Sequence, residues 1–315
     1  MAWNLANAQQ LSNSKLTKYV VDEFRKSALM DRLVWDNNAK VSGGASFTYA
    51  YNRVTTLPTA APRLINADYG AQEPVTTQFT ATLGIFGGSF QIDRALAANE
   101  REVVDLVQFH VQQKAQAAVA EFHNEFINGN AGNGLGEFDG LDVFLALNPG
   151  QVIVTGVSLD SSANITTNWR TLLDQLRQAR ALMDKAPSFW LMNQDMYAVW
   201  QSVMDRAGIN VLSKQEYGYE VAQWGPSIVM PLGDVPGFTT PIIPTAVGGT
   251  TSIYGVYTGM DGVHGVAPDN GAFVKTYMPD FTNSAALQTG SVEAIAAIAI
   301  KAARSVVRID NIDIA

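Results

Sequence analysis

The sequence predicts an α+β fold, and features spread over its 315 residues support this. Residues 98–128 contain no glycine or proline and place apolar side chains at helical spacing. Residues 47–52 alternate between two sets of side chains, as in a strand, and residues 76–83 do so more weakly. Residues 168–206 carry two amphipathic helical patterns, and residues 227–258 are rich in proline, glycine and β-branched residues, which predicts short strands. Helices and strands are thus both expected.

The helix expected over 98–128 is unusually long for a globular protein. Its apolar stripe is formed by Val104, Val107, Val111, Ala115, Ala118, Phe122 and Phe126. Asn99 and Glu102 have the spacing of a capping box, and Gly129 is expected to end the helix in the left-handed conformation. At about 1.5 Å per residue the helix spans about 46 Å, whereas the mean helix has about 11–12 residues. We therefore expect it to be a structural spine.

A long two-stranded ribbon is expected within residues 41–93. Phe47, Tyr49 and Tyr51 share one face of its first strand. The segment Val54–Val75 between the strands is polar and is interrupted by Pro58, Pro62, Gly70 and Pro74. Such a segment cannot form a core, and an isolated ribbon is only marginally stable in water. We therefore expect the ribbon to lie on the surface of a neighbouring molecule.

The composition excludes several classes of protein. Charged residues make up 16 % of the chain, against about 25 % in typical domains. Because the cores of protein–protein interfaces are depleted in charged residues, this low content indicates that partners cover much of the surface. The net charge is −8 without a run of basic residues, which argues against a nucleic-acid-binding surface. There is no cysteine, no apolar run long enough to span a membrane, and no signal-peptide pattern in residues 1–14.

The histidines do not predict a metal site. They are His110, His123 and His264. The first two lie on the long helix, where their directions differ by roughly 140°, and the third stands alone in a glycine-rich segment. We expect surface or supporting roles for all three.

The acidic residues do not predict a catalytic dyad. Close pairs are Glu121/Glu125, Asp139/Asp142 and Asp310/Asp313. None comes with a visible partner base, so we interpret them as solvated faces or turn ligands. The sequence thus predicts no enzyme, no catalytic residue, no metal site and no cofactor.

Three segments carry a resemblance to a known family. The long helix ends in Phe126-Ile-Asn-Gly, and a glycine-rich connection leads to Phe138-Asp-Gly-Leu. Further segments are Tyr254–Val266 and Ala303–Ile312 near the C-terminal end. In this order they resemble the major capsid proteins of tailed bacteriophages, which share the Hong Kong 97 (HK97) capsid fold. The resemblance extends over nearly the whole chain.

The resemblance implies a division of the chain into four parts. These are an N-terminal arm over 1–35, an extended loop with flanking strands over 41–93, a peripheral domain over 94–141 plus 267–303, and an axial domain over 142–266 with 304–315 as a candidate addition. In this scheme the helix over 98–128 is the spine of the peripheral domain.

The implied function is that of a major capsid protein. It would assemble into hexamers and pentamers of an icosahedral head that encloses double-stranded DNA without specific binding. The implied partners are further copies of the chain, a separate scaffolding protein, a portal and a decoration protein, and the implied location is the virion, assembled in the host cytoplasm. Some members cross-link through a lysine on the extended loop, but no lysine occurs between Val41 and Gln113, and Lys40 lies only at the loop's root.

Seven residues are expected to contact other subunits, because of their projection and side-chain type. They are Leu16 and Phe24 on the arm, with Tyr49, Tyr51, Arg53, Arg63 and Tyr69 on the loop. Three alternative functions remain open at this point: an encapsulin-type bacterial compartment with the same fold, a hydrolase with an unrecognised carboxylate site, and a β-rich adhesin.

Overall fold

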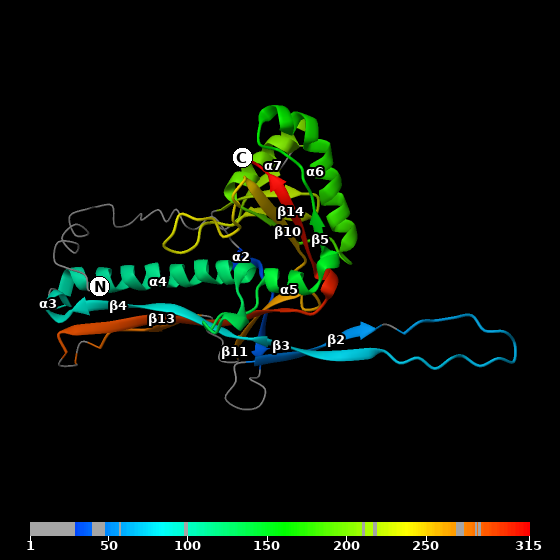
Figure 1. The fold of residues 1–315 in the computed structure, drawn as a ribbon. Coiled ribbons are helices and arrows are strands. Elements are labelled where there is room, and N and C mark those ends of the chain that lie inside the picture. The colour runs from blue at the N-terminus through cyan, green and yellow to red at the C-terminus, as the bar shows by residue number, and fades with distance from the viewer. Residues whose placement is uncertain are drawn as a thin grey trace.

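The computed structural model of the chain describes residues 29–39, 48–56, 58–97, 100–209, 212–216, 219–268, 274–280, 282 and 285–315. These residues form a five-stranded sheet, a seven-stranded sheet and a two-stranded ribbon. In Figure 1 a long helix lies along the five-stranded sheet, the ribbon extends away from one end, and the seven-stranded sheet stands above them. The predicted α+β class is confirmed.

The five-stranded sheet is built around β13. Its strands are β1 (Trp35–Ala39), β4 (Gly84–Asp93), β11 (Val263–Pro268), β12 (Val274–Tyr277) and β13 (Leu287–Ile300). The order is β1-β11-β13-β12, with β4 also paired to β13, and only the β1–β11 pairing is parallel. Along the first half of β13 alternate residues are buried, because one face of the sheet is covered by a helix.

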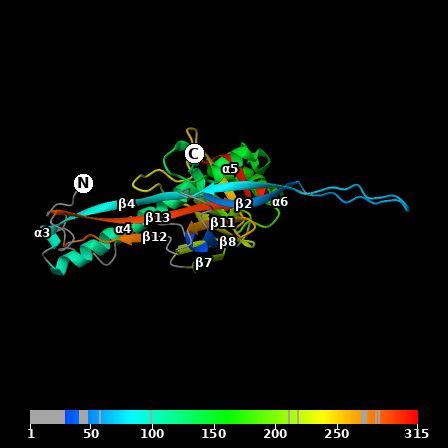
Figure 2. The ribbon, with the colours of Figure 1, turned by 90° about the horizontal axis from the view of Figure 1, so that it is seen from below.

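That helix is α4, which runs from Glu100 to Asn128 along β4 and β13 (Figure 2). It confirms the expected long helix, although the expected cap residue Asn99 lies outside the described residues. Phe122 is at the centre of its packing, with ring centroids 5.6 Å from Trp35, 6.1 Å from Phe86 and 5.5 Å from Phe138. Two short helices, α2 (Leu29–Arg32) and α3 (Arg94–Ala97), lie beside it.

Gly129 ends α4, but not in the way expected from the sequence. Its φ angle is not positive. Instead, a Cβ atom at this position would lie 2.4 Å from the Phe138 carbonyl oxygen and 2.6 Å from that of Glu125. Gly140 is equally close to the helix end, and its N–H donates to the Gly129 carbonyl at 2.8 Å. Glycine is required here because two backbone segments touch.

Glu125 is buried behind this contact, which corrects its interpretation as part of a solvated face. Its side chain is 4 % exposed, and one carboxylate oxygen accepts a 3.4 Å hydrogen bond from the Phe138 N–H. Burial, opposed by that bond and reinforced by Glu121 and Glu137, raises the pKa of Glu125 to about 7.

The seven-stranded sheet has the order β5-β14-β10-β6-β9-β8-β7. Its strands are β5 (Val152–Val154), β6 (Phe189–Met192), β7 (Leu212–Glu216), β8 (Tyr219–Trp224), β9 (Ser227–Pro231), β10 (Thr250–Val256) and β14 (Val306–Asp313). Helices α6 (Ser162–Leu182) and α7 (Gln194–Arg206) pack on it around Trp190 and Trp200. The first begins earlier than its sequence pattern indicates, because the Ser161 hydroxyl accepts from the Asn164 N–H and caps it.

Short elements join the two larger sheets. They are η2 (Ala131–Asn133), α5 (Leu141–Leu147), η3 (Pro149–Gln151) and η4 (Ala303–Ser305). Asp139 accepts a 2.9 Å hydrogen bond from the Ala131 N–H, which confirms it as a turn ligand. Among the helices of the described ranges, none combines the length and the apolar character needed to cross a bilayer. The expected arm contacts Leu16 and Phe24, and Lys40, lie outside the described residues.

We predict that Gly129→Ala destabilises the fold by about 2–3 kcal/mol, because the added methyl group overpacks two carbonyl oxygens. The free energy of unfolding, measured by urea denaturation, checks this. Gly150→Ala is the matched control, since a Cβ atom there meets nothing within 4 Å and the φ angle is not positive. Equal loss of stability in the two variants would contradict the packing argument.

A second prediction concerns pH. The folded-state pKa of Glu125 lies above its ordinary value of 4.5, so this side chain stabilises the fold fully below about pH 4.5, and the contribution is lost as the pH rises to about 7. Glu125→Gln keeps the neutral form at every pH. We expect it to match the parent at pH 4.5 and to exceed it by about 3 kcal/mol at pH 8.

Urea denaturation at the two pH values measures this difference. The control is Glu73→Gln, an exposed carboxylate on the ribbon that changes the net charge equally. If parent and Glu125→Gln show parallel dependence on pH, the buried carboxylate is not the cause.

Candidate functional site: the ribbon, its root and the α5 junction

The ribbon consists of β2 (Thr48–Thr56) and β3 (Val75–Thr82), an antiparallel pair. Opposite residues of such a pair share a face. One face therefore carries the pairs Tyr49↔Ala81, Tyr51↔Phe79 and Arg53↔Thr77. Tyr49, Tyr51 and Ala81 pack against Val266 of β11 and Ala299 of β13. We call Tyr49, Tyr51, Arg53, Phe79 and Ala81 the ribbon root.

Beyond the root the ribbon leaves the body of the molecule. Residues 54–56 and 58–78 are all exposed, and Figures 1 and 2 show this segment extending away from both sheets. We call residues 58–74 the ribbon tip. Leu64 and Ile65 there are 82 % and 92 % exposed, and Tyr69 is 67 % exposed. A pair of adjacent apolar residues so fully in water is available to a partner surface.

The tip has internal contacts of its own. The Arg63 Nη1 donates to the Ala67 carbonyl at 3.0 Å, and the Arg63 guanidinium lies 5.3 Å from the centre of the Tyr69 ring. The Thr59 N–H donates to the Gln72 side-chain oxygen at 3.0 Å. These contacts shape the turn but leave its apolar side chains uncovered.

Arg53 connects the ribbon root to the end of β13 and to α5. Its Nε donates to the Lys301 carbonyl at 3.0 Å, and its Nη2 donates to the Ile300 carbonyl. Its guanidinium carbon lies 4.3 Å from the ring centre of Phe79 and 5.5 Å from that of Phe144 on α5. These contacts lie within one subunit, so an additional contact of Arg53 with another subunit stays a prediction.

Tyr49 holds the root to the five-stranded sheet. Its hydroxyl donates to the Asp36 carboxylate of β1 at 2.9 Å. Burial first, and then Asp36, raises the pKa of Tyr49 to about 12, so the hydroxyl remains a donor at neutral pH. The ring also packs edge-on against His264, with centroids 6.0 Å apart.

All three histidines are buried, which contradicts a surface placement and leaves the expected supporting role. His110 stacks on Phe90 with ring centroids 5.4 Å apart, and His264 is fully buried beneath the ribbon root. Burial lowers the pKa of His123 to about 4 and lowers the pKa of the other two as well. These histidines are packing residues.

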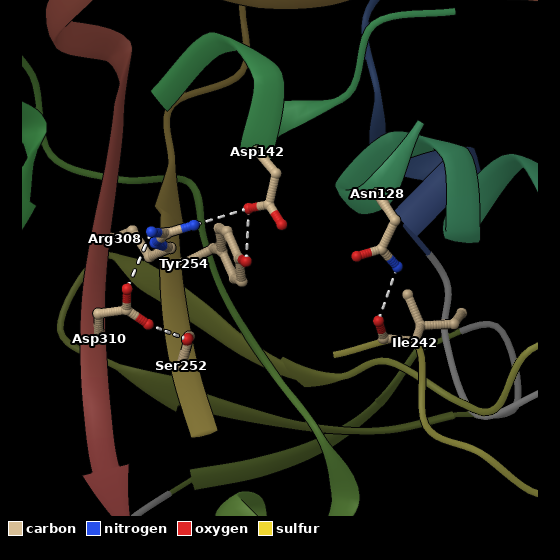
Figure 3. A network of polar contacts seen from close by, with 7 residues as sticks. All are labelled: Asn128, Asp142, Ile242, Ser252, Tyr254, Arg308 and Asp310. Carbon is tan, nitrogen blue, oxygen red and sulfur yellow. Dashed lines mark hydrogen bonds and ion pairs between the residues drawn. The ribbon is translucent and has the colours of Figure 1, made fainter. Parts of the chain in front are cut away.

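Figure 3 shows the polar network that joins α5 to the seven-stranded sheet. The Asp142 carboxylate accepts from the Tyr254 hydroxyl at 2.7 Å and from Arg308 Nη1 at 3.0 Å. Arg308 Nη2 donates to Asp310 at 2.9 Å, and the Ser252 hydroxyl donates to the same carboxylate. We call these five residues the α5 junction.

The α5 junction corrects the interpretation of Asp142 and Asp310 as parts of solvated faces or as turn ligands. Asp142 and Asp310 are 168 positions apart, yet Arg308 bridges them. Nearby, the Asn128 side chain at the end of α4 donates to the Ile242 carbonyl at 2.8 Å (Figure 3). Among the described residues no three histidine or acidic side chains are placed to share a metal ion. The arrangement joins α5 to β10 and β14 through side-chain hydrogen bonds and ion pairs.

No protein-family model matches the sequence, and no curated protein matches it. Solved structures do resemble the fold. An encapsulin from Synechococcus elongatus has a TM-score of 0.59 at 18 % identity, covering 99 % of this chain and 97 % of that chain. The capsid of the Myoviridae phage XM1 has a TM-score of 0.59 at 11 % identity, covering 98 % and 99 %.

The capsid of a native GTA particle has a TM-score of 0.57 at 13 % identity, covering 91 % of this chain and 90 % of that chain. In all three cases the similarity covers nearly the whole of both chains. The chain therefore has the HK97-type fold that phage capsid proteins and encapsulin share.

Proposed function

We propose that this chain is the major capsid protein of a tailed bacteriophage. It is a non-enzymatic subunit that assembles into the hexamers and pentamers of an icosahedral head. The observation that carries this proposal is the ribbon tip, a segment that extends away from both sheets (Figure 1) and carries the exposed apolar residues Leu64 and Ile65. A segment of this kind gains stability only on the surface of another subunit.

Assembly through such a segment does not require strong individual contacts. Each subunit both offers a ribbon tip and receives one, and closure of a ring multiplies the affinity of every contact. The low content of charged residues favours the same mechanism, since little charge has to be desolvated when surfaces meet.

We propose that the division into four parts follows the sheets. The peripheral domain comprises α4 with β12 and β13, and β4, at the end of the 41–93 segment, pairs with β13. The axial domain is the seven-stranded sheet with α6 and α7. Residues 304–315 belong with the axial domain, because β14 pairs with β5 and β10. The arm over 1–35 and the loop over 41–93 connect subunits.

Among the seven expected contact residues, Arg63 and Tyr69 lie on the tip and are proposed as contacts together with Leu64 and Ile65. Tyr49, Tyr51 and Arg53 belong to the root, where they already contact their own subunit. Their contact with a neighbour is a prediction, as is that of Leu16 and Phe24.

The head is proposed to enclose double-stranded DNA without specific binding. A net charge of −8 and the lack of a basic run give phosphates no dense array of partners. Assembly takes place in the host cytoplasm, with a separate scaffolding protein, a portal and a decoration protein as proposed partners. The mature location is the virion.

An encapsulin-type compartment is the second candidate function. The observation that favours it is the match to the Synechococcus elongatus encapsulin over 99 % of this chain. Expression of the full chain, followed by sedimentation and negative-stain microscopy with and without candidate scaffold, separates the two. Shells or capsomers that close with scaffold support the capsid, shells that carry a native enzyme cargo support the compartment, and a stable monomer contradicts both.

We predict that replacing both Leu64 and Ile65 by aspartate lowers the fraction of assembled subunits about tenfold or more. The loss reflects apolar burial of about 1.5–3 kcal/mol for each side chain. Analytical sedimentation at a fixed subunit concentration measures it, and circular dichroism verifies that the subunit is folded.

The matched control exchanges the two side chains, Leu64→Ile with Ile65→Leu, and keeps their apolar character. We expect this control to assemble like the parent. Normal assembly of the aspartate variant would show that the ribbon tip is not a contact.

A further inference from the structure

The ribbon root and the α5 junction meet on one short helix, α5. Arg53 packs against Phe144 of α5, and Asp142, two residues earlier on the same helix, is bound to the seven-stranded sheet. We infer that Arg53 and α5 couple the direction of the ribbon to the orientation of the seven-stranded sheet. This inference concerns a single subunit and does not rest on the proposed function.

Arg53 lies where the ribbon leaves the body. It is the last partly buried residue of β2, and its neighbour Phe79 is the first on β3, because residues 54–56 and 58–78 are exposed. The two hydrogen bonds from Arg53 end on the carbonyls of Ile300 and Lys301, at the end of β13. A planar guanidinium that donates to two carbonyls has a fixed orientation, so it fixes the angle at which β2 departs.

The same guanidinium contacts α5. Its carbon atom is 5.5 Å from the centre of the Phe144 ring, within the range of a cation–π interaction. Phe144 also packs against the hydrophobic core that contains Phe122. A rotation of the ribbon about its root moves the guanidinium across this ring. The movement then either breaks the contact or carries α5 with it.

On its other side α5 is held by charge. Asp142 accepts hydrogen bonds from Tyr254 of β10 and Arg308 of β14, which are directly paired across these two strands. Side-chain exposures of 22 % for Arg308 and 37 % for Asp142 place this ion pair partly out of water. Charge-assisted hydrogen bonds in such a setting are stronger than neutral ones, so α5 follows the seven-stranded sheet as a unit.

Distance measurements between spin labels test the coupling. The chain contains no cysteine, so introduced cysteines are labelled without background. Ala61 on the ribbon tip, Ser89 on β4 and Ala181 on α6 are exposed positions for labels. Pulsed dipolar spectroscopy on labelled full-length chain, diluted with excess unlabelled chain, gives the distance distributions for Ala61–Ser89 and Ala61–Ala181.

Arg53→Lys keeps the charge but loses the fork that reaches two carbonyls. We expect it to broaden both distributions about twofold. The decisive variant is Asp142→Asn. Asp142 itself contacts Tyr254 and Arg308 and not the ribbon. If α5 couples the ribbon to the seven-stranded sheet, Asp142→Asn must broaden the Ala61–Ser89 distance distribution, which reports on the ribbon relative to the five-stranded sheet.

The matched control is Asp174→Asn, which removes the same charge from an exposed pair with Arg177 on α6. It is expected to leave both distributions unchanged. In the double variant of Arg53→Lys with Asp142→Asn, coupling predicts broadening no greater than that of the larger single variant.

An unchanged Ala61–Ser89 distribution in Asp142→Asn, or additive broadening in the double variant, would overturn the inference. If Asp142→Asn does not fold, Phe144→Leu replaces it, because leucine keeps the burial and removes the ring. The same broadening is then expected, and its absence contradicts the coupling. A negative result in this test does not contradict the proposed shell assembly, because sedimentation tests that proposal separately.

Discussion

The contact between the end of α4 and the start of α5 is the constraint on which the rest of the structure depends. Gly129 and Gly140 bring two backbone segments so close that neither position has room for a Cβ atom. The hydrogen bond from the Gly140 N–H to the Gly129 carbonyl fixes the direction of α5, whose N-cap is Gly140. This direction decides that Asp142 meets the seven-stranded sheet and that Phe144 meets the ribbon root.

The sequence predicts those features that depend on local patterns. The apolar stripe of α4 and the alternation of β2 are visible without knowledge of any partner, because side-chain direction follows from the period of the backbone. The start of α6 was also visible in principle. Ser161 precedes the first helical residue, and its hydroxyl accepts from the Asn164 N–H and caps the helix. From the sequence the helix is expected to start at residue 168, because the apolar pattern begins at Trp169.

Burial and long-range pairing could not be predicted in this way. Arg53 binds carbonyls about 250 positions away, and nothing local distinguishes it from an exposed arginine. Glu125 is four residues from Glu121, and this spacing is typical of a solvated face. It is buried because the segment after the glycine-rich turn folds back over the helix end. A further overlooked signal is the adjacent apolar pair Leu64 and Ile65 in the proline-interrupted tip.

The charged side chains of the α5 junction and the ribbon root differ from those of the ribbon tip in what they contact. Arg308 with Asp142 and Asp310 lies inside the α5 junction, and Arg53 lies inside the ribbon root. These charges therefore hold elements of one subunit together. The ribbon tip, in contrast, offers the exposed apolar pair Leu64 and Ile65. Its charged side chains Arg63, Asp68 and Glu73 are exposed, and Arg63 is engaged by its own turn. In the proposed shell, the partly buried charges thus set the internal geometry of each subunit, while burial of Leu64 and Ile65 contributes a part of the contact between subunits that salt screens little.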